Sequence, residues 1–329
     1  MVKYPKISVN IPLRTSENAE IVIQSLQKVK YPKNKIEVII IEGTHIAKQR
    51  NKGIQCSDGE IIYLLDNDSE VQPNALQIIA KEFSNKKIAV LGGPSLSPIH
   101  TRSYFSRLIG YVLETQFGAL RMRFRYSQQT TKAPINEYHL IGANLALRKK
   151  LVVQVGGFNE KIVPNEETEL LRRIQKKGHI LRYNERLFVR REQRTNIIAL
   201  IHQFYRYGKG RAKQINYAAT LSDVIFILPI LFLFYLISLI LYHAPLYFIP
   251  IVLYMIAGIT TSLKASIKYR DSKIPLIMPF LFPIIHLSYT IGLLQYLLKP
   301  NSKTKKKLED NTIRVRSINL RYYRLQRDR

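Results

Sequence analysis

Two aspartates, Asp66 and Asp68, stand one residue apart directly after an apolar run, in the sequence IIYLLDND. Two carboxylates this close repel each other unless a cation lies beside them. Oxygen ligands of this kind suit a hard divalent ion that also holds phosphate oxygens. The pair therefore indicates a metal and diphosphate site, although an isolated D-x-D is also consistent with a plain polar turn after a strand.

The run before the aspartates, Ile61–Leu65, predicts a buried strand, because a short apolar run between polar turns is typical of a central sheet position. Strand and helix patterns alternate up to residue 93. Strands are expected at 7–12, 37–41, 61–65 and 88–93, and helices at 18–28, 47–55 and 73–83. This alternation predicts an α/β fold with a doubly wound, mostly parallel sheet, in which ligands bind at the carboxyl ends of the strands.

The pattern is less regular after residue 96. Residues 97–134 hold several arginines among apolar side chains, which is consistent either with an amphipathic segment on a membrane surface or with a basic insertion. Residues 166–177 predict a helix with an acidic first turn and a basic end, the polarity that the helix dipole favours. One or two strands are expected within 180–189, and a helix at 197–207 that ends at the glycines after it.

Two long apolar runs follow, 224–242 with 19 uncharged residues and 246–263 with 18. Each is close to the ~20 residues that a membrane span needs. A third apolar segment, 274–298, is expected either to span the membrane or to be re-entrant or interfacial, broken at Pro279 and Pro283. The sequence thus predicts an α/β domain (1–215), membrane helices (216–298) and a basic cytoplasmic tail (299–329).

The net charge of +28 indicates an anionic partner. Basic residues crowd beside the apolar runs and no nucleic-acid-binding motif is present, which favours anionic membrane lipids over nucleic acid. The lone cysteine, Cys56, excludes an intrachain disulfide framework and a cysteine-based zinc site.

Several motifs, in their order along the chain, resemble those of the family 2 glycosyltransferases, inverting enzymes with a GT-A (Rossmann-like) fold that use nucleotide-sugar donors. The resemblance covers roughly residues 5–213. The matching stretches are Ile7–Arg14 (opening strand and nucleotide loop), Glu42-Gly43, Gln49–Gly53 (R-N-x-G), Asp66–Asp68 (D-x-D), Gly142–Asn144 (G-x-N), Gly156–Phe158 (G-G-F), Asn165–Glu167 (G-E-D) and Gln203–Tyr207 (Q-x-x-R-W).

This resemblance implies a role for particular residues. It implies that Glu167, which stands where the family has Asp, is the catalytic base, with Glu166 as the second candidate. The implied donor-binding residues are Pro12, Arg14, Glu42, Arg50, Asp66, Asp68, Gln203 and Arg206. The implied acceptor-side residues are Gly142, Asn144 and Tyr207. Asp68 and Asp66 would hold the divalent cation, Mg²⁺ or Mn²⁺, while Arg190 stands where many members have a metal-contacting His.

The function implied by the resemblance is metal-dependent transfer of a sugar from a UDP- or GDP-sugar to a membrane-associated acceptor, such as a polyprenyl-linked glycan or polyprenyl phosphate. A multi-pass membrane protein with a cytoplasmic catalytic domain is expected. Two other classes remain open: an inactive, membrane-tethered relative that acts as a scaffold, and a membrane-anchored nucleic-acid binder.

Overall fold

The computed structural model describes residues 4–98, 103–131, 133–217, 219–226, 228–242, 244–300 and 313–320. The chain divides into two compact units, and each is described by itself. The first unit consists of residues 1–98, 124–192 and 305–329, and the second of 99–123 and 193–304.

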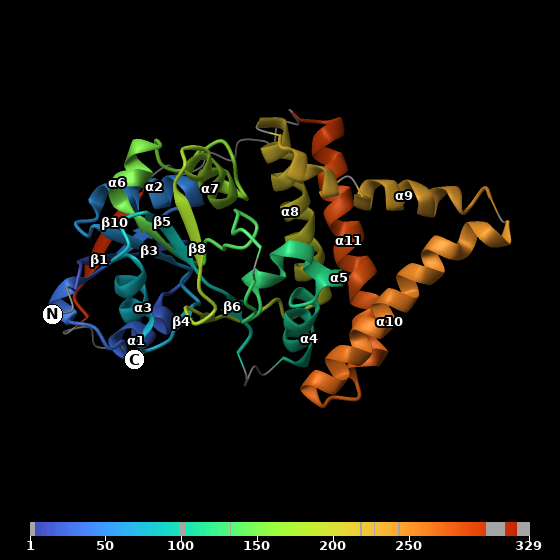
Figure 1. Ribbon diagram of the computed structural model, residues 1–329, viewed down its shortest axis with the longest axis horizontal. Helices are drawn as coiled ribbons and strands as arrows, with labels where there is room; N and C mark the ends of the chain where they lie inside the picture. The colour runs from blue at the N-terminus through green and yellow to red at the C-terminus, as the bar shows by residue number, and fades with distance from the viewer. Residues whose placement is uncertain are drawn as a thin grey trace. The chain divides into compact units, whose positions relative to one another are not determined.

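The first unit is built on a seven-stranded sheet (Figure 1). In sheet order the strands are β10 (Arg314–Ile318), β2 (Ile36–Glu42), β1 (Ile7–Leu13), β3 (Ile61–Leu65), β7 (Asn144–Arg148), β5 (Ile88–Gly92) and β8 (Ile180–Tyr183). Five of the seven strands run in one direction, while β7 and β10 run against them. The prediction of a mostly parallel α/β sheet is confirmed.

Helices cover both faces of this sheet (Figure 1). One face carries α1 (Glu20–Gln27) and α3 (Ala75–Glu82), and the other carries α2 (Ile46–Cys56), α6 (Lys149–Gln154) and α7 (Glu166–Lys176). A short 3₁₀ helix, η1 (Lys33–Lys35), leads into β2. All five residues of β3 are buried, because a central strand covered on both faces can expose no side chain.

A second, small sheet lies next to the aspartate pair. Its strands, in order, are β4 (Glu70–Val71), β9 (Val189–Arg190) and β6 (Ser95–Leu96). Strand β4 begins two residues after Asp68, and Glu70 pairs with Arg190 of β9. The small sheet therefore brings the chain around residue 190 to the residues that follow β3.

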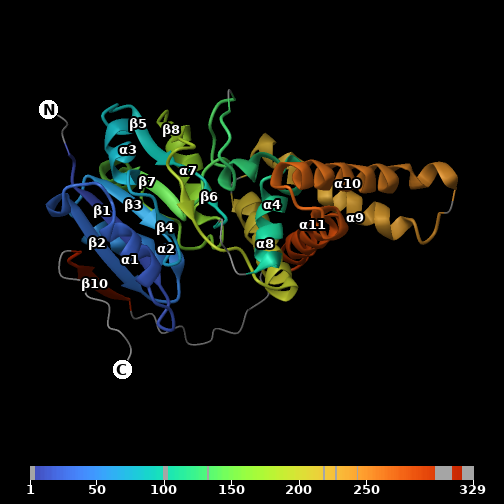
Figure 2. The same cartoon turned by 90° about the horizontal axis from the view of Figure 1, so that it is seen from below.

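The edge strand β10 comes from the segment that the sequence predicted as a tail. Its register with β2 is antiparallel and runs from Arg314 opposite Glu42 to Ile318 opposite Val38 (Figure 2). Part of 299–329 is thus a strand of the seven-stranded sheet. The basic run Lys303–Lys307, which was expected to meet lipid head groups, lies outside the described residues.

The second unit is helical. Its elements are α4 (Tyr104–Leu113), α5 (Gln116–Ala119), η2 (Leu120–Arg125, which ends in the first unit), α8 (Ile197–Tyr217), η3 (Leu221–Phe226), α9 (Leu228–Ser238), η4 (Pro245–Phe248), α10 (Ile249–Tyr269) and α11 (Ile274–Leu298). Helix α4 packs against α11 and buries Leu108, Ile109 and Val112. Residues 104–113 of the arginine-rich segment therefore form a packed helix of this unit.

Helix α8 is ten residues longer than predicted, because the glycines that were expected to end it instead allow close helix packing. A Cβ atom on Gly208 would lie 1.9 Å from the carbonyl oxygen of Tyr289, and one on Gly292 would lie 2.0 Å from that of Tyr205. Glycine at both positions lets the backbones of α8 and α11 approach each other directly.

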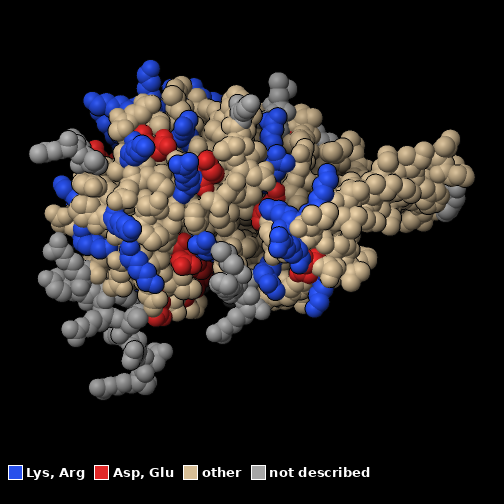
Figure 3. Space-filling view, turned by 60° about the horizontal axis from the view of Figure 1, so that its bottom comes forward, with Lys and Arg blue, Asp and Glu red and all other residues tan. Residues whose placement is uncertain are grey.

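Among the residues that the structure describes, two helical segments are long and apolar enough to cross a membrane, Pro245–Tyr269 and Ile274–Leu298. Helix α11 continues through Pro279 and Pro283, so the break predicted there is wrong; each proline removes only the bond to the carbonyl four residues before it. The first expected span, 224–242, contains an α-helix of only 11 residues, α9. On the face drawn in Figure 3, the outer end of the α9–α10 pair shows no charged side chain.

Candidate active site

Asp66 and Asp68 follow β3 at the carboxyl edge of the sheet, where the amide of Ser69 closes a turn by donating to the carbonyl oxygen of Asp66 at 3.1 Å. Both carboxylates are partly exposed, with side-chain accessibilities of 23% and 41%. They are therefore within reach of a ligand from solvent, as the sequence predicted.

Arg50, on α2, connects this aspartate pair to the acidic end of α7. Its side chain is buried, and Nη1 donates to Glu166 Oε1 at 2.6 Å while Nη2 lies 3.9 Å from Asp66 Oδ1. A Cβ atom on Gly142 would lie 2.8 Å from Arg50 Nη2, so a glycine at this position leaves space for the guanidinium. Gly142 therefore serves to place Arg50.

The turn at Gly156–Phe158 also places Arg50, through the next residue on α2. Asn51 Nδ2 donates to the carbonyl oxygen of Phe158 at 2.9 Å, and the amide of Phe158 donates to Asn51 Oδ1 at 2.8 Å. Gly157 has φ +68°, and a Cβ atom there would lie 2.7 Å from Asn51 Oδ1. The R-N and G-G-F motifs are thus hydrogen-bonded to each other, through Asn51 and Phe158.

Glu166 is almost completely buried, and burial raises its pKa to about 7. The Arg50 guanidinium lowers this pKa and the neighbouring Glu167 carboxylate raises it, but the loss of hydration has the largest effect. Glu166 Oε1 is held by Arg50, while Oε2 has no hydrogen-bond partner in the part of the chain that the structure describes.

Glu167 is the more accessible of the two acids, with a side-chain accessibility of 12%. Its Oε1 atom lies 3.6 Å from Arg125 Nη1. Arg125 is itself fixed, because Nε donates to the carbonyl oxygen of Tyr138 and Nη2 to that of Glu137, both at 2.9 Å. The guanidinium of Arg125 therefore orients the Glu167 carboxylate but leaves it partly accessible.

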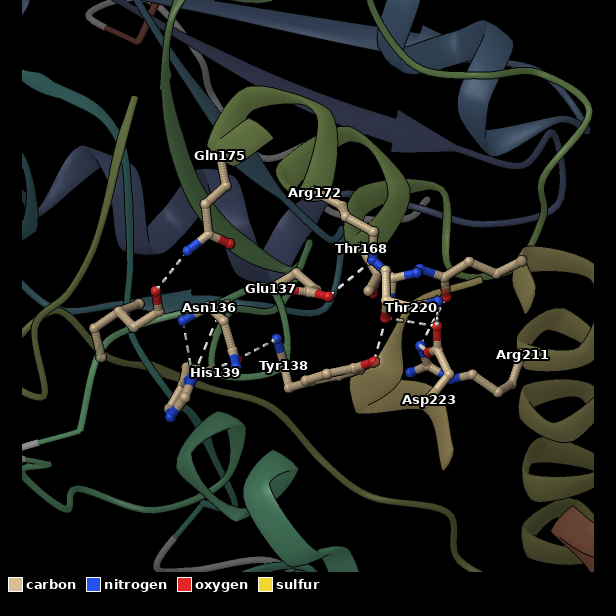
Figure 4. A network of polar contacts seen from close by, with 12 residues as sticks. Asn136, Glu137, Tyr138, His139, Thr168, Arg172, Gln175, Arg211, Thr220 and Asp223 are labelled. Atoms are coloured by element: carbon tan, nitrogen blue, oxygen red, sulfur yellow. Dashed lines mark hydrogen bonds and ion pairs between the residues drawn. The ribbon is translucent and has the colours of Figure 1, made fainter. Parts of the chain in front are cut away.

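The loop that holds Arg125 is fastened to α7 by a second arginine. Arg172 Nε donates to Glu137 Oε1 and Nη2 donates to the hydroxyl of Tyr138, each at 2.9 Å (Figure 4). Helix α7 starts after Asn165, which has φ +82°, a left-handed conformation that Asn tolerates better than most residues. This backbone geometry accounts for an Asn where the family motif has Gly.

Asn144 is completely buried and its amide group is fully used. Its Oδ1 accepts from the Tyr63 hydroxyl at 2.7 Å, and Nδ2 donates to the carbonyl oxygens of Leu187 and Pro94 at 2.7 and 3.1 Å. It therefore joins β3 and β7 to neighbouring loops and leaves no polar atom for an acceptor.

Glu42, at the end of β2, forms an ion pair with Arg316 of β10. Gln49 of α2 ties the same edge together, because its Nε2 donates to the carbonyl oxygens of Leu13 and Ile41 at 2.9 and 2.6 Å. Pro12 is buried inside β1, while Arg14 is exposed just after it. Of these predicted donor residues, Arg14 and Glu42 lie at the edge that also carries Asp66.

The aspartate pair is already compensated by an arginine that the sequence did not single out. Arg191 Nη1 lies 2.8 Å from Asp66 Oδ2, and Arg191 Nε lies 2.8 Å from Asp68 Oδ1. Its neighbour Arg190 instead lies over the ring of Phe188, at 5.0 Å from the centroid. The described residues contain no group of three or more His, Cys, Asp or Glu that could hold a metal ion.

Gln203, Arg206 and Tyr207 lie on α8, in the second unit. Gln203 Nε2 donates to the Tyr207 hydroxyl at 2.9 Å, one helical turn away, and Arg206 is exposed. Three of the predicted residues are thus brought together on one helix, and their role toward a donor remains a prediction.

Sequence reasoning missed Arg125 and Arg191 as partners of the acids. Arg125 stood in the arginine-rich segment that looked like an insertion, and Arg191 follows the residue that was compared with the family histidine. The usable signal was their type: an arginine close to a turn rich in acids is a ready counter-ion.

The arrangement places two acid pairs and their arginine partners at one edge of the sheet, and comparisons with known proteins identify the family. The profile of the glycosyl transferase family group 2 matches residues 61–260. The search of curated proteins gave no match.

The solved structures that are similar to this chain include two that cover more than 90% of it. One is the mannosyltransferase PcManGT from Pyrobaculum calidifontis, described in complex with GDP-Man and Mn²⁺, with 15% identity, a TM-score of 0.54, and coverage of 91% of this chain and 89% of that one. The other is residues 1–349 of TarS from S. aureus, with 13% identity, a TM-score of 0.46, and coverage of 94% and 96%. The first shows a shared GT-A-like fold, and the family profile spans more than half of the sequence. The chain belongs to the glycosyl transferase family group 2.

Proposed function

We propose that this glycosyltransferase transfers a sugar, with inversion, from a nucleotide-sugar donor to a membrane-associated acceptor. The observation that carries the proposal is the link through Arg50, which contacts Glu166 at 2.6 Å and approaches Asp66 to 3.9 Å. It sets a diphosphate-binding acid pair and a proton-accepting acid pair in one cluster at the carboxyl edge of the sheet.

The donor side is assigned to Asp66, Asp68, Arg14 and Glu42. Asp66 and Asp68 supply carboxylate oxygens, the ligands that hard divalent cations prefer, and Asp68 Oδ1 lies 2.8 Å from the cationic Arg191 Nε. Mg²⁺ and similar ions take one or two protein carboxylates and complete their shell with phosphate oxygens and water. Such a cation, when bound by Asp66 and Asp68, would offset charge on the departing diphosphate. The Mn²⁺ and GDP-Man of the similar mannosyltransferase support a metal-assisted UDP- or GDP-sugar donor.

Glu167 is assigned as the general base. Its carboxylate takes the proton from the acceptor hydroxyl as that oxygen bonds to the anomeric carbon, and the bond from this carbon to the diphosphate oxygen breaks. Arg125, 3.6 Å away, orients the carboxylate before the reaction. Glu166 is less suited, because it is buried and one of its oxygens is held by Arg50.

The acceptor is assigned to the membrane because of the second unit. Helices α10 and α11 carry large exposed apolar residues, such as Ile267 at 80% and Leu276 at 70% exposed. A soluble protein rarely leaves so continuous an apolar surface uncovered. These helices favour an acceptor such as a polyprenyl phosphate or polyprenyl-linked glycan, with the exposed Arg206 on α8 available for anionic groups.

The test is a donor screen with detergent-purified protein and extracted lipids, read by the mass of the lipid products. We expect a sugar-sized mass increase with one UDP- or GDP-sugar. The increase should disappear in Asp68→Ala and Glu167→Gln and persist in Asp58→Asn, which changes an exposed acid before the other end of β3. Donor turnover absent from the wild-type protein under every condition would instead support the scaffold function.

A further inference from the structure

Arg191 occupies the place between the two carboxylates where a divalent cation is expected. Its Nη1 lies 2.8 Å from Asp66 Oδ2, and its Nε donates to Asp68 Oδ2 at 3.0 Å while lying 2.8 Å from Oδ1. One guanidinium therefore bridges both acids of the D-x-D pair, in the two-pronged manner for which its planar fork is suited.

The backbone of Arg191 is fixed, but its side chain is not enclosed. Its amide donates to the carbonyl oxygen of Leu96 at 2.8 Å, directly after the three-stranded sheet. Its side chain has an accessibility of 27%, so solvent and a ligand can reach the guanidinium. The backbone of Arg191 is thus held by the small sheet, while its guanidinium is accessible at the aspartate pair.

A cation that approaches the aspartates must compete with this guanidinium. A unit charge ~3–4 Å away changes the local energy by up to ~4 kcal/mol where water is partly excluded, and by less at a site as exposed as this one. Arg50 adds further positive charge 3.9 Å from Asp66. Two carboxylates already balanced by two arginines hold little attraction for a free metal ion.

A nucleoside diphosphate changes this balance. Its phosphate oxygens attract a guanidinium by the same paired hydrogen bonds that the carboxylates use, and they also supply ligands to a divalent ion. We infer that Arg191 is an internal counter-ion of Asp66 and Asp68 that moves from them to the donor diphosphate, so that a divalent cation binds together with the donor and not before it. This inference rests on the proposed donor site and assigns Arg191 as a further donor-binding residue.

Titration of Mn²⁺ by electron paramagnetic resonance, with and without GDP or UDP, tests the inference on the full-length protein. The wild-type protein should bind free Mn²⁺ weakly, and the nucleoside diphosphate should tighten this binding. Arg191→Gln should bind Mn²⁺ roughly tenfold tighter without nucleotide, because a competing charge has been removed. Arg190→Gln, which changes the adjacent arginine over Phe188, should match the wild-type protein.

Three results would overturn the inference. Equal Mn²⁺ affinity in Arg191→Gln and the wild-type protein would show that Arg191 does not compete with the cation. If Asp68→Asn loses nucleotide-dependent Mn²⁺ binding in the same experiment, the proposed donor site itself is still supported. Nucleotide binding that is unaffected by EDTA but lost in Arg191→Gln would mean that the arginine replaces the metal permanently. Failure of the wild-type protein to bind either nucleotide by calorimetry would refute the proposed donor site itself.

Discussion

Arg50 and Glu166 form a buried ion pair, with Nη1 2.6 Å from Oε1, that fastens the N-terminal end of α7 to α2. Because the same guanidinium approaches Asp66, a change at Arg50 acts on both ends of the candidate site. Arg50→Lys keeps the positive charge, but a single ammonium group cannot contact Glu166 and Asp66 at once as the planar guanidinium does. Turnover should therefore fall by ~10²-fold.

Gly142→Ala tests the same relationship while leaving Arg50 unchanged. The added Cβ would lie 2.8 Å from Nη2 and would displace the guanidinium. Product formation should fall as in Arg50→Lys, and the measurement is the mass-based transfer assay at saturating donor. Normal turnover in both variants would mean that the Arg50 link has no part in the reaction.

The raised pKa of Glu166 makes stability depend on pH. The pKa rises from 4.5 to about 7 on folding, so between these values the unfolded chain is ionised while the folded one keeps the proton. The free energy of unfolding should therefore fall as pH rises from about 5 to 7 and level off above this range.

Glu166→Gln should remove this particular pH dependence. The melting temperature of the variant relative to the wild-type protein, followed in detergent from pH 5 to 8, should increase with pH. A difference that stays constant over the range would show that the pKa of Glu166 is not raised in the folded protein.

Substitutions at Glu167 distinguish a base from a structural acid. Glu167→Gln cannot accept a proton, and transfer should fall by ~10²-fold or more while donor affinity changes little. Glu167→Asp restores the family residue but withdraws the oxygens from Arg125, so we expect a loss smaller than that of the Gln variant. Glu166→Gln is measured beside them, and full activity of Glu167→Gln would assign the base elsewhere.

The two glycines between α8 and α11 should be sensitive to substitution. Gly208→Ala or Gly292→Ala places a Cβ about 2 Å from a backbone oxygen of the facing helix. Because a backbone atom cannot move aside as a side chain can, the two helices must separate. Each change should cost at least about 1–3 kcal/mol of stability.

Gly258→Ala is the matched control, because its Cβ would meet only ordinary contacts at 3.6 Å. Thermal unfolding in detergent should rank it with the wild-type protein, well above the other two. Similar melting temperatures for all three alanine variants would contradict the close approach of α8 and α11.

The sequence predicted those parts of the fold that depend on local pattern. The apolar runs of β1, β2, β3 and β5 were located to within a residue or so, since buried parallel strands need an unbroken apolar stretch. The register of distant elements leaves no such signature. Strand β10, RVRSI, is mostly exposed and pairs with a strand more than 270 residues earlier, so nothing in its own composition identifies it.

The site was predicted in the same uneven way. The acids could be singled out because the spacing of a local motif is visible in the sequence itself, as it is for Asp66 and Asp68. Their arginine partners come from separate segments of the chain. The side chain of Arg125 donates to the carbonyl oxygen of Tyr138, and the amide of Arg191 donates to that of Leu96. Glycines were also misinterpreted: Gly208 looked like a helix end, and only the facing helix shows that it is a packing position.

The return of the chain to the first sheet as β10 restricts how many times it can cross a bilayer. Residues 7–92 and 314–318 belong to one sheet, so a chain that leaves at residue 192 and comes back must make an even number of crossings. Three apolar segments cannot then all be spans, and α9, only about 16 Å long, is the weakest of them. Cys56, which is exposed, and a cysteine introduced at Ser302 should consequently react with an impermeant thiol reagent from the same side of the membrane.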